Sequence, residues 1–205
     1  MTTALAEDRS SNTTPPASPA PPKKASLLKR ILFVFAAVIA VLLVVIAMQP
    51  SDFRVSRSVT MAAPQAAVFE PVNDFHNWEA WSPWAKKDPN AKGTYEGPTS
   101  GVGSKFSWDG NSDVGAGSMT IVESEPTEHV GIKLDFIRPF AGTSDVDFTL
   151  QPEGEGTHVT WTMAGKNNFI GKAIGLVIDC DKMIGGEYEK GLANLKAIVE
   201  KTETN

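Results

Sequence analysis

The segment that decides the fold is Asn168 to Glu200, NFIGKAIGLVIDCDKMIGGEYEKGLANLKAIVE. Its large apolar side chains recur mostly every three or four residues, which places them on one face of a helical segment. These side chains are Ile170, Ile174, Val177, Ile178, Ile184, Tyr188, Leu192, Leu195 and Val199. An apolar helical face has to be buried against a partner layer, so the preceding part of the chain must supply one.

The preceding part, from Phe53 to Gly165, has the alternation of short strands. In residues 129–137, for example, Val130 and Ile132 alternate with Gly131 and Lys133, which is typical of a strand with one buried face. The order of strands and helices along the chain predicts an α+β fold with seven antiparallel strands around the C-terminal helix. The expected strands are 53–61, 93–96, 104–108, 117–124, 129–137, 143–151 and 157–164, with short helices at 64–69 and 73–81 after the first strand.

The first 52 residues have a different character. Residues 1–26 are rich in Pro, Ser and Thr and are predicted to be a disordered tail, because they offer little to bury. Residues 31–48 contain no charged or polar side chain, and this run of 18 is long enough to cross most of the ~30 Å hydrocarbon core of a bilayer as a slightly short helix. We therefore expect one transmembrane helix at 27–48, a ligand-binding domain at 53–200 and a short tail at 201–205.

The charges around the apolar run predict its orientation. Lys23, Lys24, Lys29 and Arg30 stand immediately before it, which favours a cytoplasmic N-terminus and a domain on the extracytoplasmic side. The alternative is a signal peptide cleaved after the small-residue site 45–47, although secretory apolar cores are usually shorter, ~7 to 15 residues. The sequence favours a retained single-pass anchor.

The domain itself is acidic. Only five of the 19 basic and two of the 24 acidic residues precede Ser51, so the part that follows carries a net charge of about −8. A domain of this charge has no electrostatic reason to bind nucleic acid or an anionic headgroup surface. Cys180 is the single cysteine, which excludes a disulfide within the chain and indicates a small packed side chain.

Several motifs resemble those of a known family. They are Phe75-x-x-Trp78-x-x-Trp81-Ser-Pro-Trp84, the strand Tyr95-Glu-Gly97, Gly101-Val-Gly-Ser104, Gly115-Ala-Gly-Ser-Met119 and the tail from Met183 to Lys196. With the order of elements, they resemble the SRPBCC superfamily, and within it the polyketide cyclase/dehydrase type 2 group of START/Bet v 1-like domains. The resemblance extends over residues 53–200.

The resemblance implies a helix-grip fold, in which the sheet folds around the C-terminal helix and encloses an apolar cavity. It also implies that Gly185-Gly186 divides the helical segment, in agreement with the cost of ~2 kcal/mol for two glycines inside a helix. The part before this pair would line the cavity, whereas residues 187–200 would provide ordinary packing. Four glycines in the segment would leave room between helix and sheet: Gly171, Gly175, Gly185 and Gly186.

Aromatic and aliphatic residues with inward parity are the candidate ligand-binding residues. Apolar walls with few polar groups bind hydrophobic molecules by burial and shape. The candidates are Trp81, Trp84, Phe106, Trp108, Leu134, Phe136, Phe148, Trp161, Ile174 and Ile178. Trp84 follows Ser82-Pro83 in a loop where a lid would lie, and Pro139-Phe140 is a second candidate rim.

Candidate catalytic groups are few. His76, His129 and His158 do not have metal-ligand spacing, so no metal site and no cofactor are expected. His76 shares a helical face with Glu79, and Asp181 falls four residues after Val177 near the apolar stripe. Asp181 and His76 are therefore the weak candidates for acid/base chemistry. Arg57 lies on the apolar side of the first strand and is expected to extend its charged end toward solvent.

Three functions remain open on the sequence. The favoured hypothesis is a membrane-anchored, non-enzymatic binding protein for a hydrophobic small molecule or lipid between the sheet and the C-terminal helix. An enzyme of the cyclase or dehydratase type would need ionisable groups inside the cavity, such as Asp181 or His76. A structural or interaction domain would have a fully packed interior.

Overall fold

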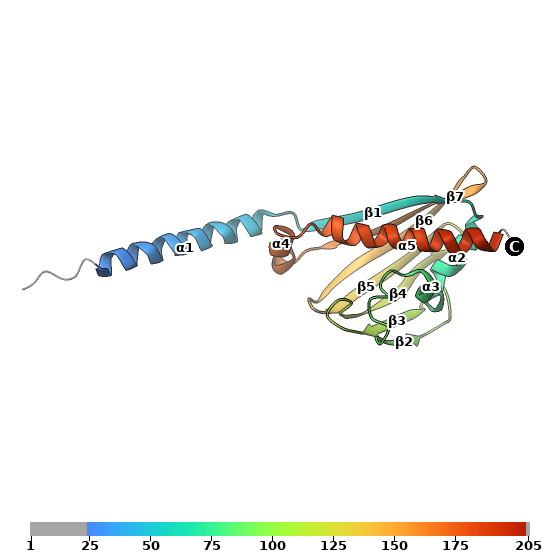
Figure 1. Ribbon diagram of the computed structural model, residues 1–205, viewed down its shortest axis with the longest axis horizontal. Coiled ribbons are helices and arrows are strands. Elements are labelled where there is room, and N and C mark those ends of the chain that lie inside the picture. The colour runs from blue at the N-terminus through green and yellow to red at the C-terminus, as the bar shows by residue number, and fades with distance from the viewer. Residues whose placement is uncertain (1–23, 204–205) are drawn as a thin grey trace, which may run out of the picture. The chain divides into compact units, whose positions relative to one another are not determined.

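The computed structural model describes residues 24–203, and the chain divides into two units, 1–44 and 45–205. Most of helix α1 (Lys24–Met48) belongs to the first unit, and Leu27–Met48 contains a window of mean hydropathy 3.4, apolar and long enough to span a membrane. The predicted disordered tail at 1–26 lies mostly outside the described residues. Its last three residues are helical, because α1 begins at Lys24 (Figure 1).

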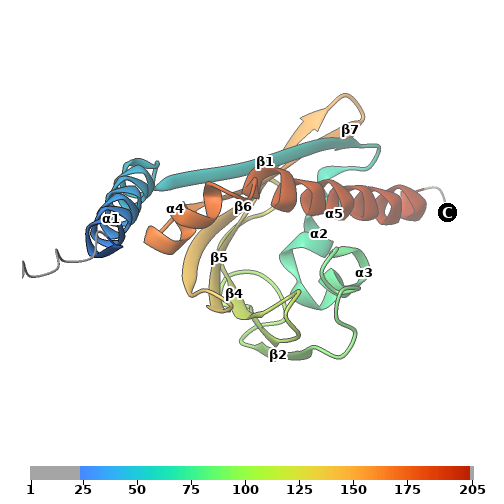
Figure 2. The same cartoon turned by 60° about the vertical axis from the view of Figure 1, so that its left-hand side comes forward.

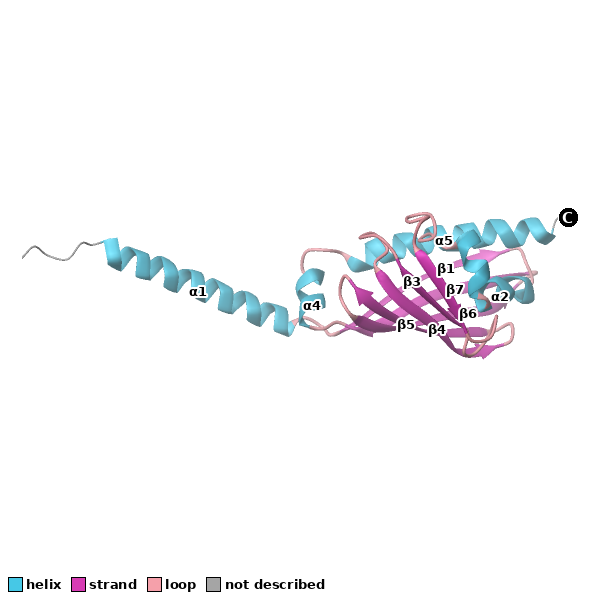
Figure 3. Cartoon of the chain, turned by 90° about the horizontal axis from the view of Figure 1, so that it is seen from below, coloured by secondary structure: helices cyan, strands magenta, loops and turns pink. Residues whose placement is uncertain are grey.

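The second unit is built on one seven-stranded sheet (Figure 3). Its order is β1-β7-β6-β5-β4-β3-β2 and every neighbouring pair is antiparallel, which confirms the sheet predicted from the alternation. The strands are β1 (Asp52–Met61), β2 (Lys92–Glu96), β3 (Lys105–Asp109), β4 (Ala116–Glu125), β5 (His129–Arg138), β6 (Gly142–Glu153) and β7 (Gly156–Lys166).

Helices cover the inner face of this sheet, the face that carries Phe148 and Trp161. After β1 the chain forms α2 (Gln65–Asn73), the 3-10 turn η1 (Phe75–Asn77) and α3 (Trp78–Trp81). After β7 it forms α4 (Phe169–Gly175) and the long helix α5 (Cys180–Glu203), which runs along β1 and packs against α2 and α3 (Figures 1 and 2). The predicted helix-grip arrangement is therefore confirmed.

The predicted break at Gly185-Gly186 is wrong, because α5 continues through both glycines. The segment is interrupted earlier, at residues 176–179, where the Asp179 carboxylate accepts a hydrogen bond from the Lys182 backbone N–H at 3.0 Å and caps the start of α5. A Cβ on Gly185 would lie 2.0 Å from Nη2 of Arg57. Glycine leaves room there for the Arg57 guanidinium of β1, which a Cβ would displace.

The two ends of the sheet differ in the elements that adjoin them. The start of β1 pairs with the end of β7, Asp52 opposite Lys166, and the end of β5 pairs with the start of β6, Phe136 opposite Gly142. We call this end the connector end, because only residues 49–51 separate it from α1. The α2 helix packs toward the opposite halves of β5, β6 and β7, where the core is fully buried.

Candidate functional site

Trp161 on β7 is the centre of an aromatic cluster between the sheet and α5. The indole is 2% exposed and stacks on Tyr188 of α5, with ring centroids 3.8 Å apart and an angle of 9° between the planes. On its other side it stacks on Phe148 of β6 at 4.8 Å. The rings of Trp78, Trp81 and Trp84 meet it edge-on at 6.2, 5.6 and 5.9 Å. Such stacked and edge-to-face contacts add stability beyond simple burial.

The Trp161 indole N–H is the exceptional polar atom of this cluster. Trp78 and Trp81 donate their indole N–H groups to the carbonyl oxygens of Val72 and Pro71, at 2.9 and 3.2 Å. Among the described residues, the Trp161 N–H is buried without a hydrogen-bond acceptor, which costs about 1 to 3 kcal/mol. Burial raises the pKa of the neighbouring Tyr188 hydroxyl, an effect that the nearby indole N–H opposes.

A second group of apolar side chains continues along the inner face on β3, β4 and β5. Its members are half-buried, and we call this group the open apolar face: Phe106, Trp108, Met119 and Phe136. Trp108 meets Phe136 edge-on at 6.0 Å and lies directly over Gly117, where a Cβ would come within 2.7 Å of the indole. Because α5 packs mainly on β1 and α3, this part of the sheet is less covered than the cluster around Trp161.

The candidate ligand-binding residues therefore fall into three places. Trp81, Phe148 and Trp161 meet in the packed cluster, with Trp84 half-buried at its edge. Phe106, Trp108 and Phe136 form the open apolar face beside Leu134, which is buried. Ile174 and Ile178 lie apart from both, in α4 and in the turn that follows it, and Ile178 is 45% exposed.

Sequence reasoning missed two residues of this region. Tyr188 was expected to provide ordinary packing, yet its ring covers Trp161 and also meets Trp84 edge-on at 6.0 Å. Its position in the apolar stripe, facing a sheet with several tryptophans, was the available signal. Met119 follows a glycine-rich turn and completes the open apolar face between β3 and β5.

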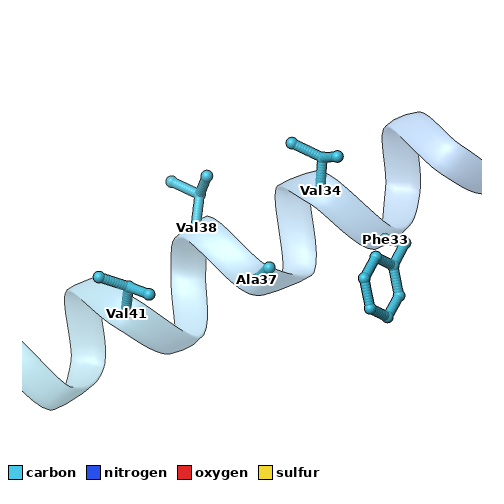
Figure 4. A pocket seen from close by; sticks show the side chains of 5 residues that line it. All are labelled: Phe33, Val34, Ala37, Val38 and Val41. Carbon is cyan, nitrogen blue, oxygen red and sulfur yellow. The ribbon is translucent and has the colours of Figure 1, made fainter.

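Two shallow hollows stand out on the described residues, and neither lies between the sheet and α5. One, of about 420 Å3, is at the connector end beside Phe53, Arg54 and Asp145. The other, of about 300 Å3, lies along α1, where Figure 4 shows Val34, Val38 and Val41 on one side of the helix. The latter is lined only by apolar side chains, so it offers no group for chemistry.

Asp181 is at the surface, in the first turn of α5. Its carboxylate is 58% exposed and accepts hydrogen bonds from the two Nη atoms of Arg57, at 3.1 and 3.0 Å. Glu189 binds Nε of the same guanidinium at 2.7 Å. Arg57 thus extends from the inner face to the surface of α5, and these hydrogen bonds raise its pKa and lower the pKa of Asp181.

This ion pair makes the acid stability dependent on Asp181. Because the native carboxyl has a lowered pKa, its contribution is present above 3.8, the ordinary Asp value, and is lost as the pH falls through the native pKa. We expect Asp181→Asn to flatten the loss of unfolding free energy on acidification, measured by urea denaturation at several pH values. In an Arg57→Met background the same substitution should change nothing further. An identical pH dependence with and without Asp181 would contradict this assignment.

His76 is also at the surface. Its Nδ1 lies 2.8 Å from Oδ1 of Asp74, and its ring stacks on Tyr95 at 4.1 Å. The imidazole is 46% exposed, and Asp74 also accepts the backbone N–H of His76, as expected for the start of a short helical turn. Within residues 24–203 no group of three or more His, Cys, Asp or Glu side chains is placed to hold a metal ion.

Solved structures share this fold at low sequence identity. Protein CV1439 from Chromobacterium violaceum is 18% identical with a TM-score of 0.52, over 74% of this chain and 99% of that one. Protein MLL2253 from Mesorhizobium loti is 18% identical with a TM-score of 0.54, over 73% and 98%. The di-domain ARO/CYC StfQ from the steffimycin biosynthetic pathway is 12% identical with a TM-score of 0.55, over 76% and 53%. No curated protein matches the sequence.

Sheet, grip helix and apolar inner face together define a domain of the SRPBCC class, which resembles Bet v 1 in architecture. Residues 52–200 match the family described as "Polyketide cyclase / dehydrase and lipid transport". The match covers most of the chain, and the protein belongs to this family. The resemblance inferred from the sequence motifs is thereby confirmed.

Proposed function

We propose that this protein is a membrane-anchored binding protein for a hydrophobic small molecule or lipid, held between the inner face of the sheet and the C-terminal helices. The observation that carries the proposal is the open apolar face. Four large apolar side chains there stay half-buried, although the same inner face is fully packed around Trp161. A surface of this kind gains free energy by taking up an apolar ligand.

The packed cluster limits where the ligand lies. Trp81, Phe148 and Trp161 already fill the centre, so the ligand would cover Phe106, Trp108 and Phe136 and reach toward α4. Trp84, half-buried at the edge of the cluster and edge-on to Trp161, would act as the lid over this site. A ligand with a large apolar body fits this arrangement.

The anchor is α1, with the N-terminus in the cytoplasm and the domain on the extracytoplasmic side. The support is its length, its hydropathy and the basic residues that precede the apolar run. The enzymatic alternative has less support, since the carboxylate and imidazole that it would use, Asp181 and His76, are both largely exposed.

Native mass spectrometry of the detergent-purified protein would test the binding proposal. The unchanged chain is expected to carry a co-purified lipid or metabolite, and Phe136→Asp is expected to lose it. Removing ~100 Å2 of apolar contact costs about 2.5 kcal/mol, or roughly a 70-fold loss of affinity, and the buried charge adds to this. Val102→Asp is the control, because Val102 is 59% exposed in the β2–β3 turn.

Three results would distinguish the hypotheses. A bound mass lost in Phe136→Asp and kept in Val102→Asp supports the proposed site, provided that near-UV circular dichroism shows both variants folded. An equal bound mass in both variants places the ligand elsewhere. No bound mass in the unchanged chain, with no binding of added fatty acid, would favour a packed interaction domain.

A further inference from the structure

The exposed large apolar side chains of the globular unit are concentrated at one end of it. They belong to α4, the turn before α5, the first turn of α5, the end of β5 and the β5–β6 turn: Phe169, Ile170, Leu176, Val177, Ile178, Met183, Ile137 and Phe140. The remaining ones after residue 48 are single and scattered: Tyr95, Val102, Val122 and Ile198. Scattered apolar residues are normal on a protein surface, whereas a concentration of them marks an interaction site.

The segment 169–178, FIGKAIGLVI, has the composition of a buried element. Its one polar side chain is Lys172, yet no residue of α4 is buried, and Val177 is 87% exposed. A helix that is apolar nearly all round is normally enclosed by protein or by lipid. Complete burial of a large apolar side chain contributes about 1.5 to 3 kcal/mol. The exposed side chains of this segment, at 42% to 87% exposure, forfeit a corresponding part of it, so another apolar phase should cover them.

This segment lies at the connector end of the sheet (Figures 1 and 2). The backbone N–H of Asn167, just before α4, donates to the carbonyl oxygen of Ser51 at 2.7 Å. Nζ of Lys172 donates to the carbonyl oxygen of Ala47 at 3.3 Å. Ser51 is the last residue before β1, and Ala47 lies at the end of α1. The connector of three residues spans at most about 14 Å between Met48 and Asp52. Any bilayer that holds α1 is therefore within reach of α4.

We propose that the surface formed by α4, the α4–α5 turn and the β5–β6 turn is a membrane-docking surface that lies in the lipid interface. The inference rests on the proposed anchor, and it adds that the domain binds the bilayer directly, through residues after β7 and between β5 and β6. Apolar side chains would enter the boundary between headgroups and acyl chains, to a depth of about 5 to 10 Å.

The polar groups of this end agree with an interfacial position. Lys172 is the only charged residue within the apolar segment, and its ammonium, which donates to the Ala47 carbonyl oxygen, has further N–H donors for the lipid headgroups. Asp179 and Asp181 follow the segment at once and are exposed, so they limit insertion to the interface. At the end of β5 and in the β5–β6 turn, Ile137 and Phe140 are 65% and 54% exposed on either side of Arg138, which forms an ion pair with Asp109. Two separate contacts would hold the domain in one orientation.

The docked orientation would also bring the ligand site to the lipid. Phe136, at the end of the open apolar face, precedes Ile137 in β5, and Ile174 of α4 belongs to the segment that would be inserted. A hydrophobic ligand could then pass between the bilayer and the inner face of the sheet without crossing water. The docking surface thus gives the proposed binding protein its source of ligand.

Lipid quenching of a site-specific fluorophore tests the docking surface in the full chain. In a Cys180→Ser background, an environment-sensitive fluorophore is attached at Val177→Cys or, as control, at Val102→Cys. Both positions are exposed valines, and Val102 lies in the β2–β3 turn at the other end of the sheet. In phosphatidylcholine vesicles containing headgroup-spin-labelled lipid, quenching at 177 is expected to exceed that at 102 by about threefold or more, as an interfacial depth requires. A fluorophore at Phe140→Cys should follow 177.

The outcomes separate the docking surface from the anchor. Alkaline carbonate extraction of the same vesicles shows whether the chain is anchored. Anchored protein with equal quenching at 177 and 102 overturns the docking surface and leaves the proposed anchor intact. Extracted protein that shows the strong quenching at 177 before extraction supports the docking surface and rejects the anchor. A blue-shifted but unquenched fluorophore at 177 would mean that a second copy covers this surface, and this result also overturns the proposal.

Discussion

Replacing Trp161 with alanine is expected to lower the free energy of unfolding by about 3 to 5 kcal/mol, the range for a fully buried large aromatic side chain. The indole is 2% exposed and touches rings from β6, α3, α5 and the loop after α3. Its loss would leave a cavity between stacked Phe148 and Tyr188. Neither ring can collapse into that space easily, because each is held by its own strand or helix.

Urea denaturation of the full chain in a non-ionic detergent, followed by near-UV circular dichroism, measures this effect. Trp84→Ala is the control, and it is expected to lose less than half as much because Trp84 is half-buried at the edge of the cluster. Trp161→Phe keeps most of the stacking and removes the unpaired N–H, so it should fall between the unchanged chain and Trp161→Ala. A loss below about 1 kcal/mol for Trp161→Ala would show that the cluster is not the centre of the core.

The same packing determines which residue can report on ligand binding. A charged residue at Trp161 would be expected to unfold the domain, since a buried unpaired charge is strongly destabilising. Loss of ligand in such a variant would say nothing about the site. Phe136 is better suited, because it is half-buried and outside the packed cluster.

Placing arginine at both Val38 and Val41 is expected to remove the protein from the membrane fraction. Both residues lie near the middle of Leu27–Met48, where each arginine costs about 2.5 to 3.5 kcal/mol on insertion. Together the two charges cost about 5 to 7 kcal/mol, which is as large as the summed advantage of the apolar residues of the helix at about 0.3 to 0.6 kcal/mol each. After alkaline carbonate extraction the unchanged chain should remain in the pellet, and the double variant should not.

A matched control and one mass measurement complete this test. Val38→Leu with Val41→Leu keeps the helix apolar and should stay in the pellet. The intact mass of the membrane-bound protein should include residues 1–48. A mass that begins after Ala47 would instead identify the apolar segment as a cleaved signal peptide, and carbonate-extractable unchanged protein would reject the anchor.

The strands could be predicted from the sequence because each has one buried and one exposed face. The expected strand 143–151 corresponds to β6 (Gly142–Glu153) and 157–164 to β7 (Gly156–Lys166). Alternation of apolar and polar residues is a local property, and it survives whatever the partner strands are. The apolar face of the final helix was equally visible, since Tyr188, Leu192 and Leu195 are all buried.

The site was only partly predictable, because parity indicates a face and not a degree of exposure. Trp161 and Trp108 both have inward parity, yet Trp161 is enclosed by five aromatic rings and Trp108 remains half-buried. The difference depends on where α5 crosses the sheet. Similarly, the acid/base candidates Asp181 and His76 were chosen by helical spacing, and the structure places both side chains near the surface.

The sheet, the grip helix and the apolar segment at residues 31–48 could be derived from the sequence alone, because periodicity and hydropathy are local properties of the chain. The course of the segment that begins at Asn168 depends on tertiary contacts. There the Gly185-Gly186 pair does not end the helix. Gly185 gives room to the Arg57 guanidinium of β1. The packed face from Tyr188 to Val199 offsets the free-energy cost of two glycines inside a helix. The break falls instead at residues 176–179, and this leaves the apolar α4 outside the core. A glycine's effect on a helix depends on what lies across from it, and no local pattern contains that information.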